Sequence, residues 1–185
     1  IPDFWPRIAA MDYGWDHPTT CTWIAWDRDS DIAYVYDSYS QSQEIPAVHA
    51  AAINARPKWI PVIWPRDGRQ ADKGSGTPLA DQYRALGVHM MKGGGRSWGG
   101  WFTNPPTSGQ MEGTGGNSVE AGIMEMLERM KTGRLKIFSN QSGVFEELRM
   151  YHRKDGRIVP FKDDLISAIR YSVMSLRHAR VKQSQ

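Results

Sequence analysis

Residues 161–171 read FKDDLISAIRY, with two adjacent aspartates where a helix is about to begin. Apolar residues at positions 165, 169, 173 and 176 follow the three-to-four spacing of a helix with one buried face. This pattern predicts a closing helix over residues 163–180. The paired charges have two readings: Asp163 caps the helix and Asp164 complements its dipole, or the pair serves a cation together with acids elsewhere in the chain.

The bulk properties predict one globular domain over residues 1–185. The chain has 185 residues, of which 40% are hydrophobic and 23% charged. No apolar run approaches the roughly 20 residues that a membrane span needs, and no signal peptide is visible at the start. The single cysteine, Cys21, excludes an internal disulfide and a multi-cysteine zinc site. We therefore expect a reducing, cytosolic setting.

The net charge of +3 is unevenly distributed along the chain. Residues 1–44 carry a net charge of −6, whereas residues 45–101 carry +5 and residues 149–185 carry +6. Such a pattern suits a carboxylate cluster ringed by cations that contact phosphates. It equally suits charges scattered over a solvated surface, so charge alone leaves a nucleic-acid partner open.

The order of the expected elements predicts an α/β fold. Three strands joined by short turns form an antiparallel meander, and helices and strands then alternate, which indicates a mixed sheet covered by helices. A long irregular, flexible loop over about residues 93–117 is expected to be functional or disordered. The expected strands are residues 7–12, 20–26, 32–39, 59–64, 88–91 and 135–138, and the expected helices are residues 44–56, 77–86, 117–131, 142–151 and 163–180.

Acidic residues stand at the ends of several expected elements. Asp12 ends the first strand, Asp67 follows the strand over residues 59–64, and Asp163 and Asp164 open the last helix. If the first strand and the strand before Asp67 are parallel neighbours, their carboxyl ends share one edge of the sheet. Converging carboxylates need cations between them, and Mg²⁺ or Mn²⁺ are the natural occupants. A pair of such ions can cleave a phosphodiester.

Each acid also has a purely structural explanation. Asp12 can begin a turn with Gly14, and Asp67 lies in a Pro-Arg-Asp-Gly turn sequence. Asp163 can serve simply as the cap of the last helix, without any further role. Spacing alone does not decide between these readings.

The order of the expected elements resembles that of a known family. A first strand that ends in an acid is followed by a meander, a helix, a strand with a second acid and a closing Lys-Asp-Asp-Leu-Ile-Ser-Ala-Ile-Arg-Tyr helix. The chain is similar to the nuclease domain of large terminase subunits of tailed phages, closest to the headful-packaging phages of enteric bacteria. The resemblance implies a ribonuclease H-like fold, with a central mixed sheet and helices on both faces. No Gly-x-x-x-x-Gly-Lys-Ser/Thr phosphate loop occurs in the chain, so we expect the nuclease domain without its packaging ATPase domain.

By that resemblance, Asp12, Asp67 and one of Asp163 and Asp164 are metal ligands and catalytic residues for two Mg²⁺ or Mn²⁺ ions. We favour Asp164, because Asp163 is expected to cap the helix. Ser167 stands where family members often carry another aspartate, which puts a fourth ligand in question. Asp16 and His17, near the first acid, are candidates to contact metal-bound water.

Basic residues flank the expected metal site. Arg66, Arg69 and Lys73 surround the second acid, and Lys162 precedes the third, so they are candidate DNA-phosphate contacts. Solvated surface is the alternative for each. The glycine-rich loop containing Arg96, Trp98 and Trp101 is expected either to contact DNA or to pack its tryptophans.

The function expected from the resemblance is cleavage of concatemeric viral double-stranded DNA during genome packaging. Its implied partners are the ATPase domain of the same full-length chain, the small terminase subunit and the portal ring, in the host bacterial cytoplasm and with no membrane. One alternative is a Holliday-junction resolvase or transposase-like nuclease of the same fold. The other is a non-catalytic module that binds DNA or the portal.

Overall fold

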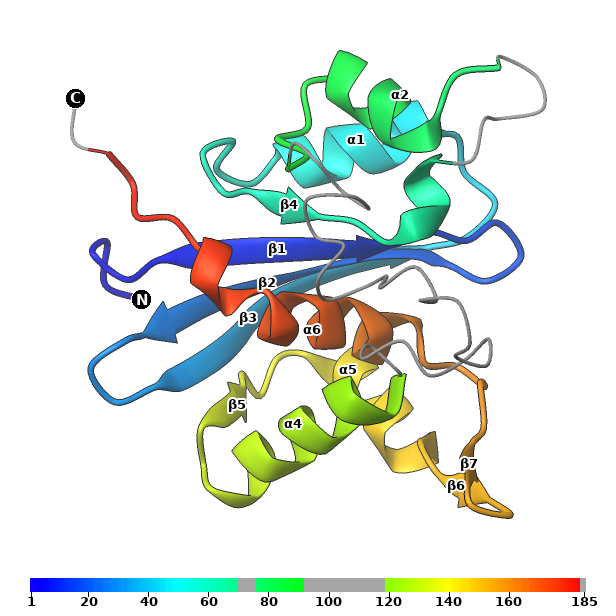
Figure 1. Ribbon diagram of the computed structural model, residues 1–185. Coiled ribbons are helices and arrows are strands. Elements are labelled where there is room, and N and C mark those ends of the chain that lie inside the picture. Colours follow the sequence, from blue (N-terminus) through cyan, green and yellow to red (C-terminus); the bar gives the residue numbers. More distant parts are fainter. Residues whose placement is uncertain (70–75, 92–118, 184–185) are drawn as a thin grey trace, which may run out of the picture.

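A five-stranded mixed sheet forms the centre of the computed structural model, which describes residues 1–69, 76–91 and 119–183 (Figure 1). The strand order is β4-β1-β2-β3-β5. Strands β1, β2 and β3 pair antiparallel, whereas β4 pairs parallel with β1 and β5 pairs parallel with β3. The predicted meander followed by parallel strands is thus confirmed. The strands are β1 (Arg7–Asp12), β2 (Thr19–Asp27), β3 (Ile32–Gln41), β4 (Val62–Ile63) and β5 (Leu135–Ile137).

Helices cover both faces of this sheet, as the family resemblance implied (Figure 1). Helices α1 and α2 lie on one face, and α4, α5 and α6 lie on the other. A short hairpin of β6 and β7 precedes α6. The bounds are α1 (Pro46–Asn54), η1 (Arg66–Arg69), α2 (Leu79–Ala85), α4 (Val119–Lys131), α5 (Ser142–Met150), β6 (Arg153–Lys154), β7 (Arg157–Ile158), α6 (Asp164–Met174) and η2 (Leu176–His178).

Strand β1 separates the two hydrophobic cores by its alternation. Ile8 and Ala10 belong to the core beneath α6, whereas Ala9 and Met11 belong to the core beneath α1 and α2. All four side chains are fully buried. Because side chains alternate along a strand, Asp12 continues the series of Ile8 and Ala10 and projects toward the α6 side.

Three expected elements differ from those in the structure. The strand over residues 59–64 shrinks to Val62–Ile63, since Pro61 and Pro65 beside it have no N–H for a sheet ladder. Residues 88–91 form only an isolated bridge from Met90 to Val62. The closing helix ends at Met174, because the Ser175 N–H bonds to the Ser172 carbonyl at 3.1 Å in a tighter 3₁₀ pattern.

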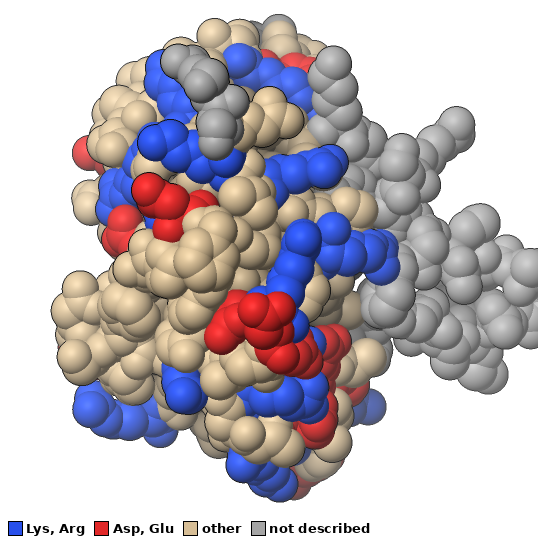
Figure 2. All heavy atoms as spheres, turned by 90° about the vertical axis from the view of Figure 1, so that its left-hand side faces the viewer, with Lys and Arg blue, Asp and Glu red and all other residues tan. Residues whose placement is uncertain are grey.

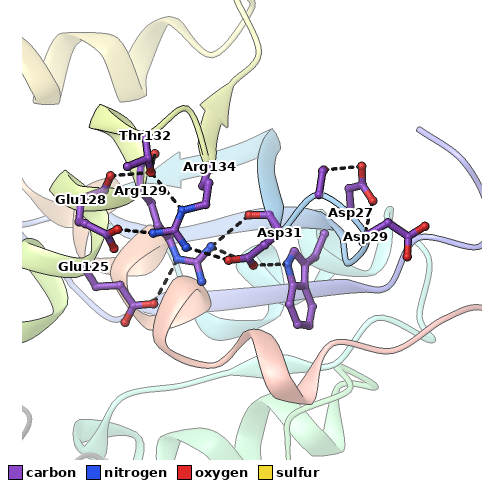
Figure 3. Close-up of polar contacts among 10 residues, drawn as sticks. Asp27, Asp29, Asp31, Glu125, Glu128, Arg129, Thr132 and Arg134 are labelled. Atoms are coloured by element: carbon purple, nitrogen blue, oxygen red, sulfur yellow. Dashed lines mark hydrogen bonds and ion pairs between the residues drawn. The ribbon is translucent and has the colours of Figure 1, made fainter.

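An ion-pair network fixes α4 and β5 to the turn between β2 and β3 (Figure 3). The Asp31 carboxylate accepts from Arg129 at 3.2 Å, from Arg134 at 2.9 Å and from the Trp26 indole at 2.9 Å. Glu128 completes the network by pairing with Arg134. Asp31 has a positive φ of 52°, a backbone conformation that aspartate tolerates better than most residues. One turn residue thus joins three partners from different elements at this end of the sheet.

The helices in the described ranges are all too short or too polar to cross a membrane. The molecular face at the β2–β3 turn carries basic and acidic side chains interspersed with one another (Figure 2). The carboxyl ends of β1 and β4 and the start of α6 lie at the opposite end of the sheet (Figure 1).

Candidate metal centre

Asp12 and Asp164 are brought together through Thr20. Asp12 is the last residue of β1 and lies opposite Thr20 in the β1–β2 ladder. The Thr20 hydroxyl in turn donates a hydrogen bond to the backbone carbonyl of Asp164, at 3.0 Å. Thr20 is fully buried, so this contact fixes the start of α6 against the end of β1. Residues 152 positions apart in the chain thereby become neighbours.

Asp67 lies beyond the neighbouring strand. Strands β1 and β4 are parallel, with Ala10 paired to Ile63. The sequence-based supposition that these strands are parallel neighbours is thus confirmed, and their carboxyl ends share one edge of the sheet. Asp67 follows β4 within the 3₁₀ turn η1 and is exposed.

The start of α6 is capped by a residue from another helix. Asp163 occupies the N-cap position, but its side chain makes no capping hydrogen bond. The Glu147 carboxylate of α5 instead accepts from the backbone N–H groups of Leu165 at 3.1 Å and Ile166 at 3.0 Å. The expectation that the Asp163 side chain caps the helix is therefore wrong. Glu147 thus satisfies two N–H groups of the first turn that Asp163, at the N-cap position, leaves without a bond.

Burial and neighbouring negative charges disfavour the ionisation of Asp12 and Asp164. Burial, followed by the charge of Asp164, raises the pKa of Asp12 from 3.8 to about 7. Asp163 and Asp67 act in the same direction, while the Arg170 guanidinium opposes them. Burial also raises the pKa of Asp164. The charges of Asp164, Asp163 and Asp67 all act on the pKa of Asp12, so this place holds negative charge that a cation can neutralise.

A buried arginine belongs to the same neighbourhood. Arg170 of α6 is only 5% exposed, and its guanidinium lies 4.5 Å from the centre of the Tyr171 ring. Gly122 of α4 makes this position accessible, because a Cβ there would lie 2.6 Å from the Arg170 Cγ. Arg170 therefore supplies a fixed positive charge that offsets part of the acidic cluster.

The acids lie near one another without forming a complete metal cage. Across the described ranges, no three histidine, cysteine, aspartate or glutamate side chains are grouped closely enough to hold one ion. His17 lies beside the cluster, with Nδ1 3.9 Å from the Asp164 Oδ2, although its own side chain is 71% exposed. Asp16 is exposed. The donor chemistry nevertheless suits Mg²⁺ or Mn²⁺, which prefer carboxylate oxygens.

The expected DNA-contacting cations are only partly described. Arg66 and Arg69 bound η1 on either side of Asp67, and Arg69 is exposed. Lys162 is exposed two residues before α6, where its ammonium lies 5.8 Å from the centre of the Phe161 ring. Lys73 and the expected loop over residues 93–117 lie outside the described residues.

Sequence reasoning does not identify three residues near this site, namely Thr20, Glu147 and Arg170. Thr20 reads as an ordinary strand residue and gives no signal. Glu147 and Arg170 did offer one, because each stands on the apolar stripe of an amphipathic helix: Glu147 three residues after Val144, and Arg170 four after Ile166. A charged residue on a buried stripe needs a partner. The partners of Glu147 are backbone N–H groups at the start of α6, and the partner of Arg170 is the acidic cluster around Asp12.

The sheet order, the two helical layers and the carboxylates at one sheet edge define a protein of the ribonuclease H-like fold. A family model described as the terminase RNaseH-like domain matches residues 9–176. The chain therefore belongs to the family of terminase nuclease domains.

Individual relatives agree with this assignment. The chain is 37% identical over 181 residues to the large terminase subunit of Salmonella phage P22, covering 97% of this chain and 33% of that protein. The solved nuclease domain of the P22 large terminase superimposes with a TM-score of 0.80 at 36% identity, covering 98% of this chain and 86% of that one. The Mn-bound nuclease domain of the phage SPP1 large terminase shares the fold, with a TM-score of 0.60 at 13% identity and coverage of 92% and 85%.

Proposed function

We propose that this chain is a divalent-metal-dependent endonuclease that cleaves double-stranded viral DNA during genome packaging. Asp12, Asp67 and Asp164, assisted by Asp163, hold Mg²⁺ or Mn²⁺, with two ions as the working arrangement. The observation that carries the proposal is the pairing of Asp12 with Thr20 and the hydrogen bond from Thr20 to Asp164. Through this contact a partly buried carboxyl group lies beside the aspartate pair at the carboxyl edge of the sheet.

The electrostatics support a cation in this place. The partly buried Asp12 carboxyl, with its pKa raised to about 7, lacks compensating positive charge at neutral pH, even with Arg170 nearby. A hard divalent ion supplies that charge. Asp67 and Asp163 are less constrained, because one is exposed and the other makes no cap bond. They complete the ligand set by turning toward Asp12 and Asp164. The Mn-bound SPP1 domain of the same fold agrees with this choice of ion.

Bound divalent ions supply an activated water and neutralise the charge that develops on the leaving 3′ oxygen. The chain's own residues orient those ions and the DNA. The ladder from β1 to β2 holds Asp12, and the Thr20 hydroxyl holds the Asp164 backbone. The candidate phosphate contacts are basic residues around η1 and before α6, which position the two phosphates beside the scissile bond. They are Arg66, Arg69, Lys73 and Lys162.

The assignment extends to the partners of a packaging motor. We infer that the domain works in the host bacterial cytoplasm as part of a longer large-terminase chain with an ATPase domain. The small terminase subunit and the portal ring are its proposed assembly partners. The family match favours this over a junction resolvase or a non-catalytic module.

Cleavage assays with matched variants test the proposal. The domain is expected to cut linear and plasmid duplex DNA with Mn²⁺ or Mg²⁺ and to stop in EDTA. Asp12→Asn, Asp67→Asn and Asp164→Asn each lower the rate at least about 100-fold, because an amide is a weaker ligand for a hard cation. Asp29→Asn is the control, since Asp29 is exposed in the β2–β3 turn. Parent-like cutting by Asp12→Asn and Asp67→Asn would refute the metal site, and cutting of four-way junctions alone would favour the resolvase.

A further inference from the structure

Glu147 occupies a place that local helix capping does not explain. It belongs to α5, is 8% exposed and lies against the first turn of α6. One carboxylate oxygen accepts from the Leu165 N–H at 3.1 Å and the other from the Ile166 N–H at 3.0 Å. These N–H groups are among the first four of the helix, which have no partner within it. A single side chain thus satisfies two of them.

A nearer cap was available to the chain. Asp163 stands at the N-cap position, where aspartate is among the preferred residues, yet its carboxylate is not used there. The fold instead buries a glutamate close to Asp163 and Asp164. Burial, with a smaller contribution from these two negative charges, raises the pKa of Glu147 to about 7. The two backbone hydrogen bonds to Leu165 and Ile166 oppose this rise, so they favour the ionised carboxylate at the start of α6.

The consequence falls on Asp164. Its backbone is held from both sides: Thr20 of β2 donates to its carbonyl at 3.0 Å, and Glu147 accepts from the two N–H groups that follow it. With the Leu165 and Ile166 N–H groups satisfied by α5, the Asp163 carboxylate makes no capping bond. The backbone position of Asp164 is fixed by partners from two other elements.

We propose that Glu147 and Thr20 are positioning residues that fix the backbone of Asp164, so that the aspartate pair presents its carboxylates to a divalent cation. This inference rests on the proposed metal-dependent function and deepens it. Glu147 acts through the α6 backbone and does not touch the cation. Outer partners that orient ligands typically change metal affinity about 10–100-fold when they are altered.

The test measures Mn²⁺ binding to the folded domain without DNA, by isothermal titration calorimetry. Glu147→Gln keeps the side-chain size but leaves one acceptor and turns an amide N–H₂ toward a backbone donor. We expect its Mn²⁺ dissociation constant to rise about 10-fold or more, and the Leu165 and Ile166 amides to lose hydrogen-exchange protection. Glu146→Gln is the matched control, since Glu146 is the exposed neighbour on α5, and its affinity is expected to stay at the parent value.

If Glu147→Gln does not fold, the Thr20→Val variant tests the same positioning role. It preserves the branched shape and removes only the hydroxyl bound to Asp164, so it too is expected to weaken Mn²⁺ binding several-fold. A variant with a lowered melting temperature but parent-like Mn²⁺ affinity overturns the positioning role and leaves the proposed function intact. A parent protein that binds no Mn²⁺ overturns the proposed function and this inference with it.

Discussion

Asp12 holds its carboxyl group in a partly buried position near other aspartates. Strand alternation directs it toward α6, and the ladder to β2 holds its backbone against Thr20. Asp12 cannot move away from the negative charges of Asp164, Asp163 and Asp67 unless the end of β1 separates from β2. Its protonation therefore reports on the acidic cluster as a whole, with Arg170 as the opposing charge.

The stability of the metal-free protein is predicted to fall as pH rises from about 4 to about 7. The folded Asp12 has a pKa of about 7 and the unfolded residue a pKa of 3.8, so between these values the folded state binds more protons. Each unit of pH then weakens folding. A three-unit difference corresponds to at most about 4 kcal/mol, reached above pH 7. Urea unfolding in EDTA across this range measures the loss.

Asp12→Asn isolates the contribution of this residue. Asparagine imitates the protonated aspartate, so in EDTA the variant is expected to match the parent near pH 5 and to exceed its stability at pH 8. The exposed Asp29→Asn variant should follow the parent throughout. Parallel curves for the parent and Asp12→Asn would show that Asp12 ionises normally in the fold.

Asp31 in the β2–β3 turn forms ion pairs with Arg129 of α4 and with Arg134 before β5 (Figure 3). Asp31→Asn keeps an acceptor for the Trp26 indole and tolerates the positive φ, but it removes the charge that faces Arg129 and Arg134. We predict a loss of about 1 kcal/mol in unfolding free energy, small because the Asp31 side chain is 39% exposed. Urea denaturation at low and high salt measures it.

Salt provides the control for that prediction. High ionic strength screens exposed ion pairs, so the difference between Asp31→Asn and the parent should shrink in concentrated NaCl. Asp29→Asn, in the same turn, changes an exposed residue and should leave stability unchanged. If Asp31→Asn loses the same unfolding free energy at all salt concentrations, the loss comes from the backbone conformation of the turn and not from charge.

The elements that could be predicted from the sequence are those whose signal is local. The three meander strands show β-branched and aromatic runs, and α6 shows its apolar stripe, so all four were recognised. The strand over residues 59–64 was overestimated because Pro61 and Pro65 interrupt its ladder. The cap from Glu147 could not be predicted, since it depends on how α5 packs against α6. Positions with a local signal were thus predictable, and contacts between distant segments were not.

The residues of the candidate site also fall into those that the sequence predicts and those that it does not. Asp12, Asp67, Asp163 and Asp164 were singled out because each ends or begins an expected element, and their ligand roles stay predictions. Thr20 could not be found, because its function arises from its ladder partner and from a helix 144 residues further along. The parallel pairing of β1 with β4 makes the sheet edge a common place for all of them.

The complete fold gathers negative charge at the place where we propose that a cation binds. The sheet, α6 and η1 together bring acids from three parts of the chain to one end of the molecule, and the ion-paired β2–β3 turn stabilises the other end (Figures 1 and 3). The folded state must tolerate the repulsion among these acids when no metal is present. An unfolded chain separates the acids, so it has neither the repulsion nor the site.

Mn²⁺ is therefore predicted to raise the melting temperature of the parent domain. A ligand that binds only the folded state stabilises it by about 2.7 kcal/mol at 100 times its dissociation constant, which for a domain of this size corresponds to about 5–10 °C. Asp12→Asn should melt higher than the parent in EDTA at pH 8 and show no shift with Mn²⁺, whereas Asp29→Asn should shift like the parent. Differential scanning calorimetry with and without Mn²⁺ measures both effects. An equal shift in Asp12→Asn would place the bound ion elsewhere on the molecule.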